Sequence, residues 1–423
     1  MIATHHLASP VAAIFLLLSA TIVHRAPAAE TPAPPPTGVG VPGMASFDRI
    51  IPELMRKHVI HGGAVAVAKD GRLVLARGYG LADVHAKQPV QPDSLFRIAS
   101  VSKPITAAAI LVLVQRKQLD IDAKVLDILD DIKPPQAAQL DPRWRKITVR
   151  HLLHHAAGFD RGKSFDPMLR PAPVVEAVGT TPEPAAIVRF MLGRPLDFDP
   201  CTRHAYSNFG YSLLGRIIEQ TTGKPYAEAV ETLVLRPAGI RRMRLGRTQR
   251  KDLADGEVHY YPTAGAEPVD SIFPDVSEQV PAPYGKFYIE AMDAHGGWIA
   301  SAVDLVRFAT ATDGSREPAL LKPATIGVLQ SRPSYVAADE QAWYALGWMV
   351  RPKGDSANWW HAGSLPGTRS LLVRTHHGLV WAVVLNTTPR HSGTFGGELD
   401  RTLWRAVEGV EKWPAHDLFG RYR

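Results

Sequence analysis

Strand-like segments lie near both ends of this chain, and a long stretch with helical character separates them. Near the N-terminus, residues 64–69 and 72–80 are apolar runs joined by Asp70-Gly71, a dipeptide suited to a tight two-residue turn. Three further runs with strand character lie near the C-terminus, at 358–363, 368–375 and 379–386. Strands from the two ends are therefore expected to pair in one antiparallel sheet, built around the helical insertion.

The segment between these strands predicts a second, mainly helical lobe. Residues 211–222 carry apolar positions at helical spacing and are followed by Gly223, a typical helix stop. The predicted fold class is α/β (α+β), with the antiparallel sheet flanked by helices. The expected sheet domain is 44–118 plus 293–423, and the expected helical lobe is 119–292.

Helical patterns also flank the strands. Residues 47–55 follow helical spacing, with Pro52 tolerated only in a first turn. Residues 105–114 are apolar almost all round, which predicts a buried helix with Pro104 in its first turn. A final helix carries the apolar positions of 399–410 on one side.

Residues 1–28 are expected to be a secretory signal peptide. Residues 11–23 form an apolar run too short to span a bilayer unaided, and Ala26-Pro27-Ala28 fits a signal-peptidase site. Lys and Arg are absent from residues 1–10, so an uncleaved anchor stays open as the alternative. Residues 29–43 are typical of a Pro/Gly-rich linker. The expected location is secreted or periplasmic, with membrane contact only where the leader is retained.

Charge and cysteine content narrow the range of partners. The formal net charge of +7 is ordinary for 423 residues, but seven basic residues and no acid lie between Arg236 and Lys251. A solvated basic face is the simpler interpretation, and contact with an anionic polymer or membrane surface is the alternative. No nucleic-acid fold signature accompanies the cluster, so no nucleic-acid partner is expected. Cys201 is the only cysteine, which excludes an intrachain disulfide.

The main candidate for chemistry is Ser100-Val101-Ser102-Lys103, where a strand-like segment gives way to the apolar helix. Residues three apart share a helix face, so the motif places the Ser100 hydroxyl beside the Lys103 amine. A lysine desolvated by apolar neighbours can have its pKa lowered enough to take the serine proton. The free N–H groups of the helix start can hold a developing oxyanion. Chance alone supplies about one Ser-x-x-Lys in a chain of this length, so further motifs must carry the argument.

Tyr206-Ser207-Asn208 lies in a polar loop just before the 211–222 helix. A tyrosine near a cationic lysine can have its phenol pKa lowered and can then pass the serine proton to a leaving group. The Asn208 carboxamide offers a donor and an acceptor to a substrate amide or ester.

His361-Ala362-Gly363-Ser364 ends the first of the C-terminal strands. Small residues there would let a substrate backbone lie against the strand edge. The Ser364 N–H can serve as a second oxyanion donor beside that of Ser100. A histidine with a structural hydrogen bond is the simpler interpretation of His361 taken alone.

In this order and spread, the three motifs resemble those of the serine β-lactamase and penicillin-binding-protein superfamily, specifically its class C β-lactamase-related branch. The similarity covers nearly all of 47–386. It extends to five further segments, at 69–71, 147–153, 210–215, 296–301 and 346–348. The resemblance implies a sandwich of the β-lactamase/transpeptidase-like type.

The resemblance also implies an exported serine hydrolase that forms an acyl-enzyme at Ser100, with Lys103 and Tyr206 sharing the proton transfers. Its substrates would be esters, amides, small peptides or β-lactams, and it would need no metal or organic cofactor. The implied substrate-binding residues are Asn208, His361, Gly363 and Ser364. The alternative is a catalytically idle member of the same fold that binds cell-wall peptides or serves as a scaffold.

Two positions depart from the family pattern. The third motif begins with His361, where true β-lactamases and DD-peptidases usually have lysine, and a histidine is mostly neutral at pH 7. This favours esters and small amides or peptides, with β-lactams and peptidoglycan stem peptides close behind. Arg369 can replace the missing charge, although an outward-facing strand arginine is the simpler interpretation. Cys201 stands where relatives commonly have glycine and is interpreted as a local packing change.

Two other patterns favour structural roles. His151 and His155 are four apart, as in some zinc sites, but Leu152 follows His151 where such sites have a glutamate, so helix packing is favoured over metal binding. Trp359 and Trp360 are expected to pack the sheet rather than line a carbohydrate site.

Overall fold

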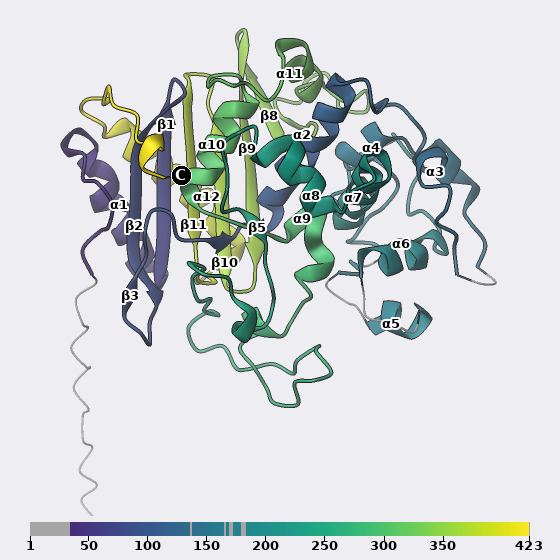
Figure 1. Cartoon of the computed structure of the whole chain (residues 1–423), viewed down its shortest axis with the longest axis horizontal. Coiled ribbons are helices and arrows are strands. Elements are labelled where there is room, and N and C mark those ends of the chain that lie inside the picture. Colours follow the sequence, from purple (N-terminus) through teal and green to yellow (C-terminus); the bar gives the residue numbers. More distant parts are fainter. Residues whose placement is uncertain (1–33, 136–137, 165, 169–171, 179–182, 423) are drawn as a thin grey trace, which may run out of the picture. The chain divides into compact units, whose positions relative to one another are not determined.

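One antiparallel sheet joins the two ends of the chain, as the strand patterns predict (Figure 1). The computed structural model describes residues 34–422 except 136–137, 165, 169–171 and 179–182. The sheet order is β3-β2-β1-β11-β10-β9-β8-β7. Strands β1 and β11 pair with Gly63 opposite Leu385, so the N-terminal hairpin meets the C-terminal strands in mid-sheet. The strands of this sheet are β1 (Gly62–Lys69), β2 (Arg72–Asp83), β3 (Gln88–Pro89), β7 (Trp343–Tyr344), β8 (Met349–Lys353), β9 (Ser356–Leu365), β10 (Thr368–Arg374) and β11 (Leu379–Leu385).

A second, small sheet holds the approach to the Ser100 motif. Its order is β4-β6-β5, with strands β4 (Phe96–Arg97), β5 (Arg244–Leu245) and β6 (Trp298–Ala300). The fully buried guanidinium of Arg97 donates to the main-chain oxygens of Pro283 at 2.6 Å and Arg247 at 2.7 Å, and it lies 4.2 Å from the ring centroid of Tyr260. These contacts tie β4 to the segment that precedes β6.

Helices cover both faces of the large sheet. Helix α10 packs against β1, β2 and β11 on the face that we call the inner face, and α1 and α12 cover the opposite, outer face. Helices α3 to α8 fall within the segment 119–292 and gather to one side of the sheet in Figure 1. The helices are α1 (Ala45–Lys57), α2 (Ser102–Gln115), α3 (Val125–Ile128), α4 (Val149–Leu153), α5 (Ala172–Val178), α6 (Pro184–Leu192), α7 (Asn208–Thr222), α8 (Tyr226–Val230), α9 (Asp293–Gly296), α10 (Ala302–Thr312), α11 (Pro323–Leu329) and α12 (Ser392–Glu408).

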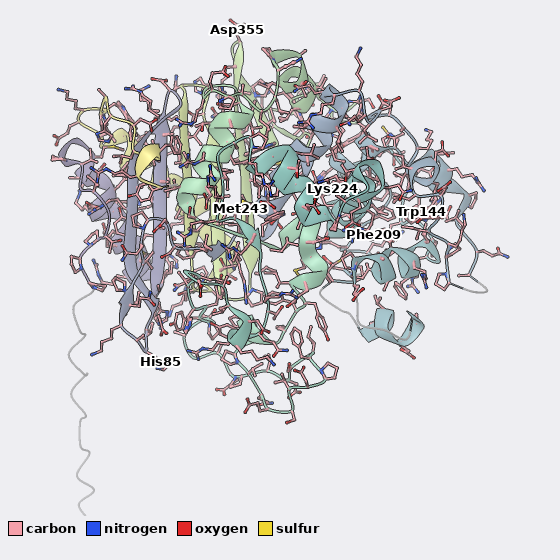
Figure 2. The ribbon with its side chains drawn as sticks, in the orientation of Figure 1. His85, Trp144, Phe209, Lys224, Met243 and Asp355 are labelled. Carbon is pink, nitrogen blue, oxygen red and sulfur yellow. The ribbon has the colours of Figure 1, made fainter. Side chains whose placement is uncertain are left out.

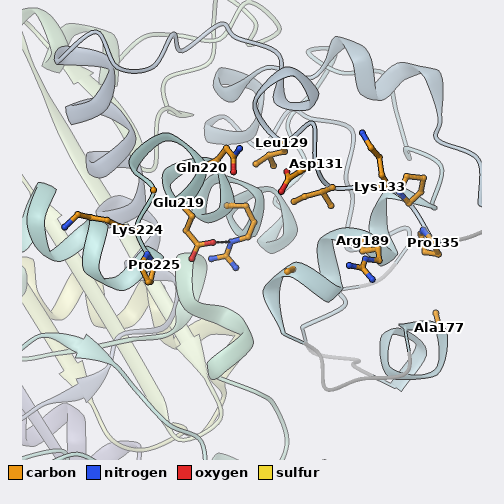
Figure 3. A pocket seen from close by; sticks show the side chains of 15 residues that line it. Leu129, Asp131, Lys133, Pro135, Ala177, Arg189, Glu219, Gln220, Lys224 and Pro225 are labelled. Atoms are coloured by element: carbon orange, nitrogen blue, oxygen red, sulfur yellow. Dashed lines mark ion pairs between the residues drawn. The ribbon is translucent and has the colours of Figure 1, made fainter.

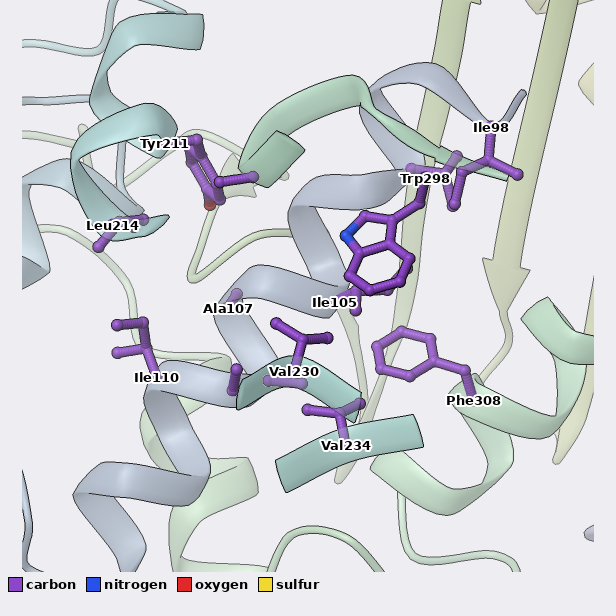
Figure 4. Close-up of a cluster of buried hydrophobic side chains, with 14 of the residues drawn as sticks. Ile98, Ile105, Ala107, Ile110, Tyr211, Leu214, Val230, Val234, Trp298 and Phe308 are labelled. Atoms are coloured by element: carbon purple, nitrogen blue, oxygen red, sulfur yellow. The ribbon is translucent and has the colours of Figure 1, made fainter. Parts of the chain in front are cut away.

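Two hydrophobic cores follow from the alternation of side chains along the strands. Residues such as Ala66 and Leu372 face the inner core, whereas their neighbours Val67 and Leu371 face the outer core with α1 and α12. Helix α2 is buried from Ser102 to Leu113, as its apolar sequence predicts. Figure 4 shows Ile105 of α2 close to Trp298, with Phe308 and Val230 nearby. The helix that follows Ser100 is therefore held on all sides.

Local signals in the sequence explain several element boundaries. Asp70 and Gly71 have φ values of +49° and +75°, the pattern of the tight hairpin turn that was expected between β1 and β2. The Ser207 side chain accepts a hydrogen bond from the Gly210 N–H at 3.1 Å and so caps α7, which ends at Gly223 in the left-handed conformation. Phe209, in the first turn of this helix, packs against Trp144 with ring centroids 6.2 Å apart (Figure 2).

The expectation that Pro52 lies in a first helical turn is wrong. Helix α1 begins at Ala45, so Pro52 lies in its interior. A proline there cannot donate to the carbonyl oxygen of Asp48. Buried Phe47, Ile51 and Leu54 pack against the outer core and hold the helix despite this loss.

Three of the seven basic residues of the sequence cluster form ion pairs with acids in the structure. Arg242 contacts Asp93 at 2.7 Å, Arg236 contacts Glu231 at 3.1 Å, and Lys251 lies 3.6 Å from Asp275. The expected signal peptide, 1–28, and residues 29–33 of the expected linker lie outside the described residues. Within the described part of the chain, no helix has the length and apolar character needed to cross a bilayer.

Candidate active site

Ser100 lies on a strained turn between β4 and α2. The residue before it, Ala99, has a φ of +47°. This conformation is unfavourable for any residue with a side chain, so the surrounding contacts must stabilise it. Ser100 is partly exposed, whereas the Ser102 hydroxyl is fully buried and accepts a hydrogen bond from the Trp298 N–H at 3.4 Å. Of the two serines in the motif, only Ser100 is placed to meet a substrate.

Two strands clamp this turn. The Thr368 hydroxyl donates to the Arg97 oxygen at 2.8 Å, and the Ser370 hydroxyl donates to the Ile98 oxygen at 2.7 Å. On β9, a Cβ atom added to Gly363 would lie 2.2 Å from the Ile98 oxygen. The turn thus passes directly against β9, which gives Gly363 a packing reason in addition to the expected contact with substrate.

The Lys103 amine is fully buried beside the serine. Its Nζ lies 3.3 Å from Ser100 Oγ, 2.8 Å from Asn208 Oδ1 and 3.0 Å from the His295 oxygen. Burial lowers the pKa of Lys103 well below its usual value, and the charge of Asp166 opposes this shift. A neutral amine has two N–H groups and one lone pair. Because Asn208 Oδ1 and the His295 oxygen can only accept, they take the two N–H groups and leave the lone pair for the Ser100 hydroxyl.

Asp166 completes this arrangement, and no sequence signal singled it out. The buried carboxylate of Asp166 accepts a hydrogen bond from Asn208 Nδ2, which fixes the carboxamide with its oxygen toward Lys103. Both ends of the Asn208 side chain are therefore occupied by protein groups. The structure gives Asn208 a role in positioning the amine, and its expected contact with substrate stays a prediction.

Tyr206 lies beside the same pair, but the expectation that its phenol pKa is lowered is wrong. Burial raises the pKa of Tyr206 above its usual value, and a hydrogen bond with Ser100 and the charge of Arg161 oppose this only in part. Lys103 Nζ lies 4.7 Å from the centroid of the Tyr206 ring, over its face rather than at its oxygen. Tyr206 is thus a neutral phenol that can donate and accept a proton, and it is not a phenolate base.

His361 is buried and neutral. Its Nδ1 lies 2.9 Å from the Ala362 oxygen, and its Nε2 lies 3.0 Å from the Tyr344 hydroxyl. Since a carbonyl can only accept, Nδ1 carries the proton and Nε2 accepts from Tyr344. Burial and the nearby Lys103 lower the pKa of His361 to about 3. The first position of the third motif therefore offers a substrate no positive charge at neutral pH.

A cavity of about 450 Å³ opens at Ser100. Strand β8 pairs with β9 only between Ser356 and Trp360, so among the described residues 361–365 have a strand neighbour on one side only. A free strand edge thus borders the cavity, as expected for a substrate that lies along it. The lining residues that the structure describes include no acid, and they are Ser100, Arg161, Tyr206, His361, Ala362, Gly363, Ser364, Arg369, Ser370, Leu371, Ser392, Gly393, Phe395, Gly396 and Leu399.

Comparison with known proteins shows the family to which this chain belongs. The family model described as Beta-lactamase matches residues 47–401. The chain belongs to the beta-lactamase family. This confirms the resemblance to the serine β-lactamase and penicillin-binding-protein superfamily.

The relatives of this beta-lactamase family member carry several activities in their names. Esterase EstB of Burkholderia gladioli is 32% identical over 211 residues, which are 47% of this chain and 50% of the esterase. D-aminopeptidase of Gluconobacter oxydans is 32% identical over 199 residues, 47% of this chain and 35% of that protein. The chain thus spans half or less of the length of these curated relatives. The D-amino acid amidase of Ochrobactrum anthropi SV3 shares the fold, with a TM-score of 0.66 at 22% identity over 88% of this chain and 99% of the amidase.

A second, larger cavity lies apart from the motifs that mark this family. It has a volume of about 900 Å³ and is bordered by α6 and by the end of α7 (Figure 3). Among the described residues, its lining holds the ion pair of Arg216 and Glu219, at 2.9 Å, but no serine, threonine, cysteine, histidine or tyrosine.

The histidine pair considered for a metal does not share a helix face. His151 lies in α4, where its Nδ1 accepts from the Thr148 N–H at 3.3 Å, whereas His155 lies beyond the helix end with a φ of +56°. The ring of His155 packs 4.3 Å from that of Tyr206, and its Nδ1 accepts from the Ser207 N–H. No group of three or more His, Cys, Asp or Glu residues is arranged to hold a metal in the described part of the chain.

Proposed function

We propose that the protein is an exported serine hydrolase that works through an acyl-enzyme at Ser100. The observation that carries this proposal is the buried Lys103 amine, which two fixed acceptors orient with its lone pair toward the Ser100 hydroxyl. A serine is a weak nucleophile until a base takes its proton, and a desolvated amine is such a base.

Acylation begins when Lys103 Nζ takes the proton of Ser100 as Oγ attacks the substrate carbonyl. The C=O bond becomes a C–O⁻ bond, and the N–H groups of Ser100 and Ser364 stabilise the oxyanion. Lys103 then gives the proton to the leaving group through the neutral Tyr206 phenol, and the leaving group departs. This step leaves the acyl group on Ser100 and returns Lys103 to its neutral form.

Deacylation repeats the sequence with water. Lys103 and Tyr206 take a proton from the attacking water, the oxyanion forms in the same position, and the Ser100–acyl bond breaks as Oγ regains its proton. The fixed positions of Ser100 and Lys103 serve both halves of the reaction.

Neutral esters and small amides or peptides are the proposed substrates. The low pKa of His361 leaves the third motif without a cation, which supports a site that needs no substrate carboxylate. The names of esterase EstB and D-aminopeptidase support the same range of acyl donors. One observation favours a second class of substrate, which carries a carboxylate. Arg369 lines the cavity from β10 instead of facing away from it.

Covalent labelling tests the proposal. A fluorescent serine-reactive phosphonate should label the full-length protein, and Ser100→Ala should abolish both labelling and ester turnover. Ser102→Ala is the matched control, because this buried hydroxyl faces the Trp298 amide and not the cavity, and it should keep the label. A folded wild-type protein that stays unlabelled would contradict the proposal and favour the idle, peptide-binding alternative.

Arg369 decides between the two substrate classes. Two of its contacts are with main-chain oxygens, at Thr368 (2.8 Å) and Leu365 (3.3 Å), so the rest of the guanidinium is available to a carboxylate. If carboxylate substrates are used, Arg369→Gln should lower kcat/KM for the β-lactam nitrocefin about tenfold, the loss of one charge-assisted hydrogen bond, and leave p-nitrophenyl butyrate turnover unchanged. An equal effect on both substrates would remove this role.

A further inference from the structure

A small cavity on the outer face of the sheet lies in line with the one at Ser100. Its volume is about 240 Å³, and no residue of the proposed catalytic machinery takes part in it. Its lining residues come from β8, β9, β10 and α12, and they are Arg351, Asn358, Trp360, Val373, Asp400 and Trp404. We call it the Trp360 cavity.

The two cavities are lined by neighbouring residues of β9, β10 and α12. Along β10, Leu371 lines the Ser100 cavity, and Val373, two residues on and thus on the same sheet face, lines the Trp360 cavity. On α12, the neighbours Leu399 and Asp400 divide between the cavities in the same way. Along β9, the path from Ser364 to Trp360 is four residues, or about 13 Å. One extended molecule can therefore reach from Ser100 to Trp360.

The outer face beside this path is uncovered in the described part of the chain. Ala362 and Ser364 are exposed, and Arg351 on β8 is exposed as well. Helices α1 and α12 cover β1, β2, β10 and β11, but the apolar contacts of Trp360 with the outer core are partial. Trp360 is therefore only half-buried, whereas its neighbour Trp359 is fully buried on the inner side.

The chemistry of the Trp360 cavity combines aromatic surface with both signs of charge. The Arg351 guanidinium lies 5.3 Å from the Trp360 ring centroid, and Trp404 stands edge-on to Trp381 with centroids 4.8 Å apart. Asp400 supplies a carboxylate with the Trp404 indole as hydrogen-bond donor, and burial raises its pKa. Asn358 uses its Oδ1 for the N–H and Nδ1 of His376, which leaves its Nδ2 as a donor.

We propose that the Trp360 cavity binds a pyranose ring of the substrate, whose acyl group then reaches Ser100 along the exposed face of β9. The proposal rests on the proposed acyl transfer at Ser100. A sugar ring presents an apolar C–H face to an indole and hydroxyl groups around its rim. Those hydroxyls can donate to Asp400 and accept from Arg351 and Asn358.

This set of groups favours a sugar over the other ligands that the Trp360 cavity could take. A purely apolar acyl chain would desolvate the Asn358 Nδ2 donor and the remaining acceptor positions of the Asp400 carboxylate without giving them partners, which costs free energy. An anion would meet the carboxylate of Asp400, and a cation would meet Arg351. A neutral ring with many hydroxyls can donate hydrogen bonds to Asp400 and accept them from Arg351. Trp359 and Trp360 both pack on the sheet as expected, and the proposal gives Trp360 a second role.

Direct binding tests the subsite without any turnover. Full-length Ser100→Ala protein, which cannot form an acyl-enzyme, is titrated with N-acetyl-D-glucosamine and with methyl β-D-glucopyranoside while tryptophan fluorescence and calorimetric heat are followed. We expect saturable binding, weakened at least tenfold by Trp360→Ala and by Asp400→Asn. Trp413→Ala is the matched control, because this partly buried tryptophan packs against the same outer core near Lys69, outside the cavity. Binding that is absent for both sugars, or equally weakened by Trp413→Ala, would overturn the subsite.

Kinetics with an intact Ser100 separate this proposal from the proposed function. Trp360→Ala should raise KM for an O-acetylated N-acetylglucosamine at least tenfold and leave p-nitrophenyl acetate turnover unchanged. Normal phosphonate labelling with no difference between the two esters would overturn the sugar subsite alone, whereas absence of labelling would overturn the acyl transfer. If light scattering shows a dimer, and the sugars quench Trp360 fluorescence only after it dissociates, a second copy of the chain covers this face. That result would also overturn the proposal.

Discussion

Lys103 has three acceptors within reach, and only one of them, the Ser100 hydroxyl, can also give a proton. The other two are an amide oxygen and a main-chain oxygen, so they fix which way the amine points. Asp166 acts one step further out, because it orients Asn208 and its negative charge raises the pKa of Lys103 against the effect of burial. A carboxylate with no hydrogen bond to Lys103 or Ser100 thus offsets part of the effect of burial on the basicity of the amine.

Asp166→Asn isolates that charge. The new carboxamide can still accept from Asn208, but without the negative charge the pKa of Lys103 falls further. The acid limb of the kcat/KM profile, which reports the loss of the neutral amine, should move to lower pH, and the plateau should fall about tenfold because a less basic amine is a weaker base. Asp160→Asn, on the same loop but paired with Arg203, is the control and should leave the limb in place. A limb that stays put in Asp166→Asn would show that the carboxylate does not act on Lys103.

At the scale of elements, the contact between the serine turn and β9 sets the site. Gly363→Ala would place a Cβ 2.2 Å from both the Ile98 oxygen and Ser370 Oγ, so the turn or the strand must move. We expect a loss of about 1–3 kcal/mol in the free energy of unfolding, as for an overpacked core. Displacing the nucleophile should also slow phosphonate labelling about 100-fold.

Gly327→Ala provides the comparison for this glycine. Nothing lies within 4 Å of the added Cβ in α11, so this change should stabilise the protein by about 0.5–1 kcal/mol and leave labelling unchanged. Urea unfolding and labelling rates measure both variants. Wild-type labelling by Gly363→Ala would show that the close approach does not position Ser100.

Patterns within one element were predictable from the sequence, and contacts between elements were not. The Asp70-Gly71 turn, the buried α2 and the three C-terminal strands each carry a local signal and were confirmed. Asp166 carries none, because its partner Asn208 is 42 residues away in the sequence. The raised pKa of Tyr206 was missed for the same reason, since burial depends on the whole fold. Cys201 is an intermediate case, because its φ of +65° is a conformation that glycine adopts without steric cost.

At the scale of the whole molecule, the decisive prediction was that the chain ends pair around an insertion. It followed from strand-like segments near both ends of the chain with helical segments between them, and the register of β1 against β11 confirms it. The anchoring of the insertion was not predictable in this way. Buried Arg97, which looks like an ordinary strand residue, donates to the oxygens of Pro283, Arg247 and Thr248, all more than a hundred residues away.

Burying histidines across this fold makes its stability depend on pH. Burial lowers the pKa of His154 to about 4 and that of His361 to about 3, and it lowers the pKa of His155 and His295 well below the usual value. As pH falls below about 6.5, the unfolded chain binds protons that the native state does not, so stability present above this pH is lost between about 6.5 and 4. His154 alone should account for a loss on the order of 3 kcal/mol by pH 4.

Thermal unfolding between pH 7 and 4 measures this loss. The midpoint should fall steadily as the solution is acidified, and His154→Asn should flatten the slope because the carboxamide does not titrate. The new side chain can still donate to the Tyr344 oxygen, which lies 3.2 Å from His154 Nδ1, so the comparison changes the titration more than the packing. His85→Asn, at an exposed position in the turn after β2 (Figure 2), should follow the wild-type slope. If His154→Asn and the wild type lose stability in parallel, protons bound by this buried histidine do not drive the acid unfolding.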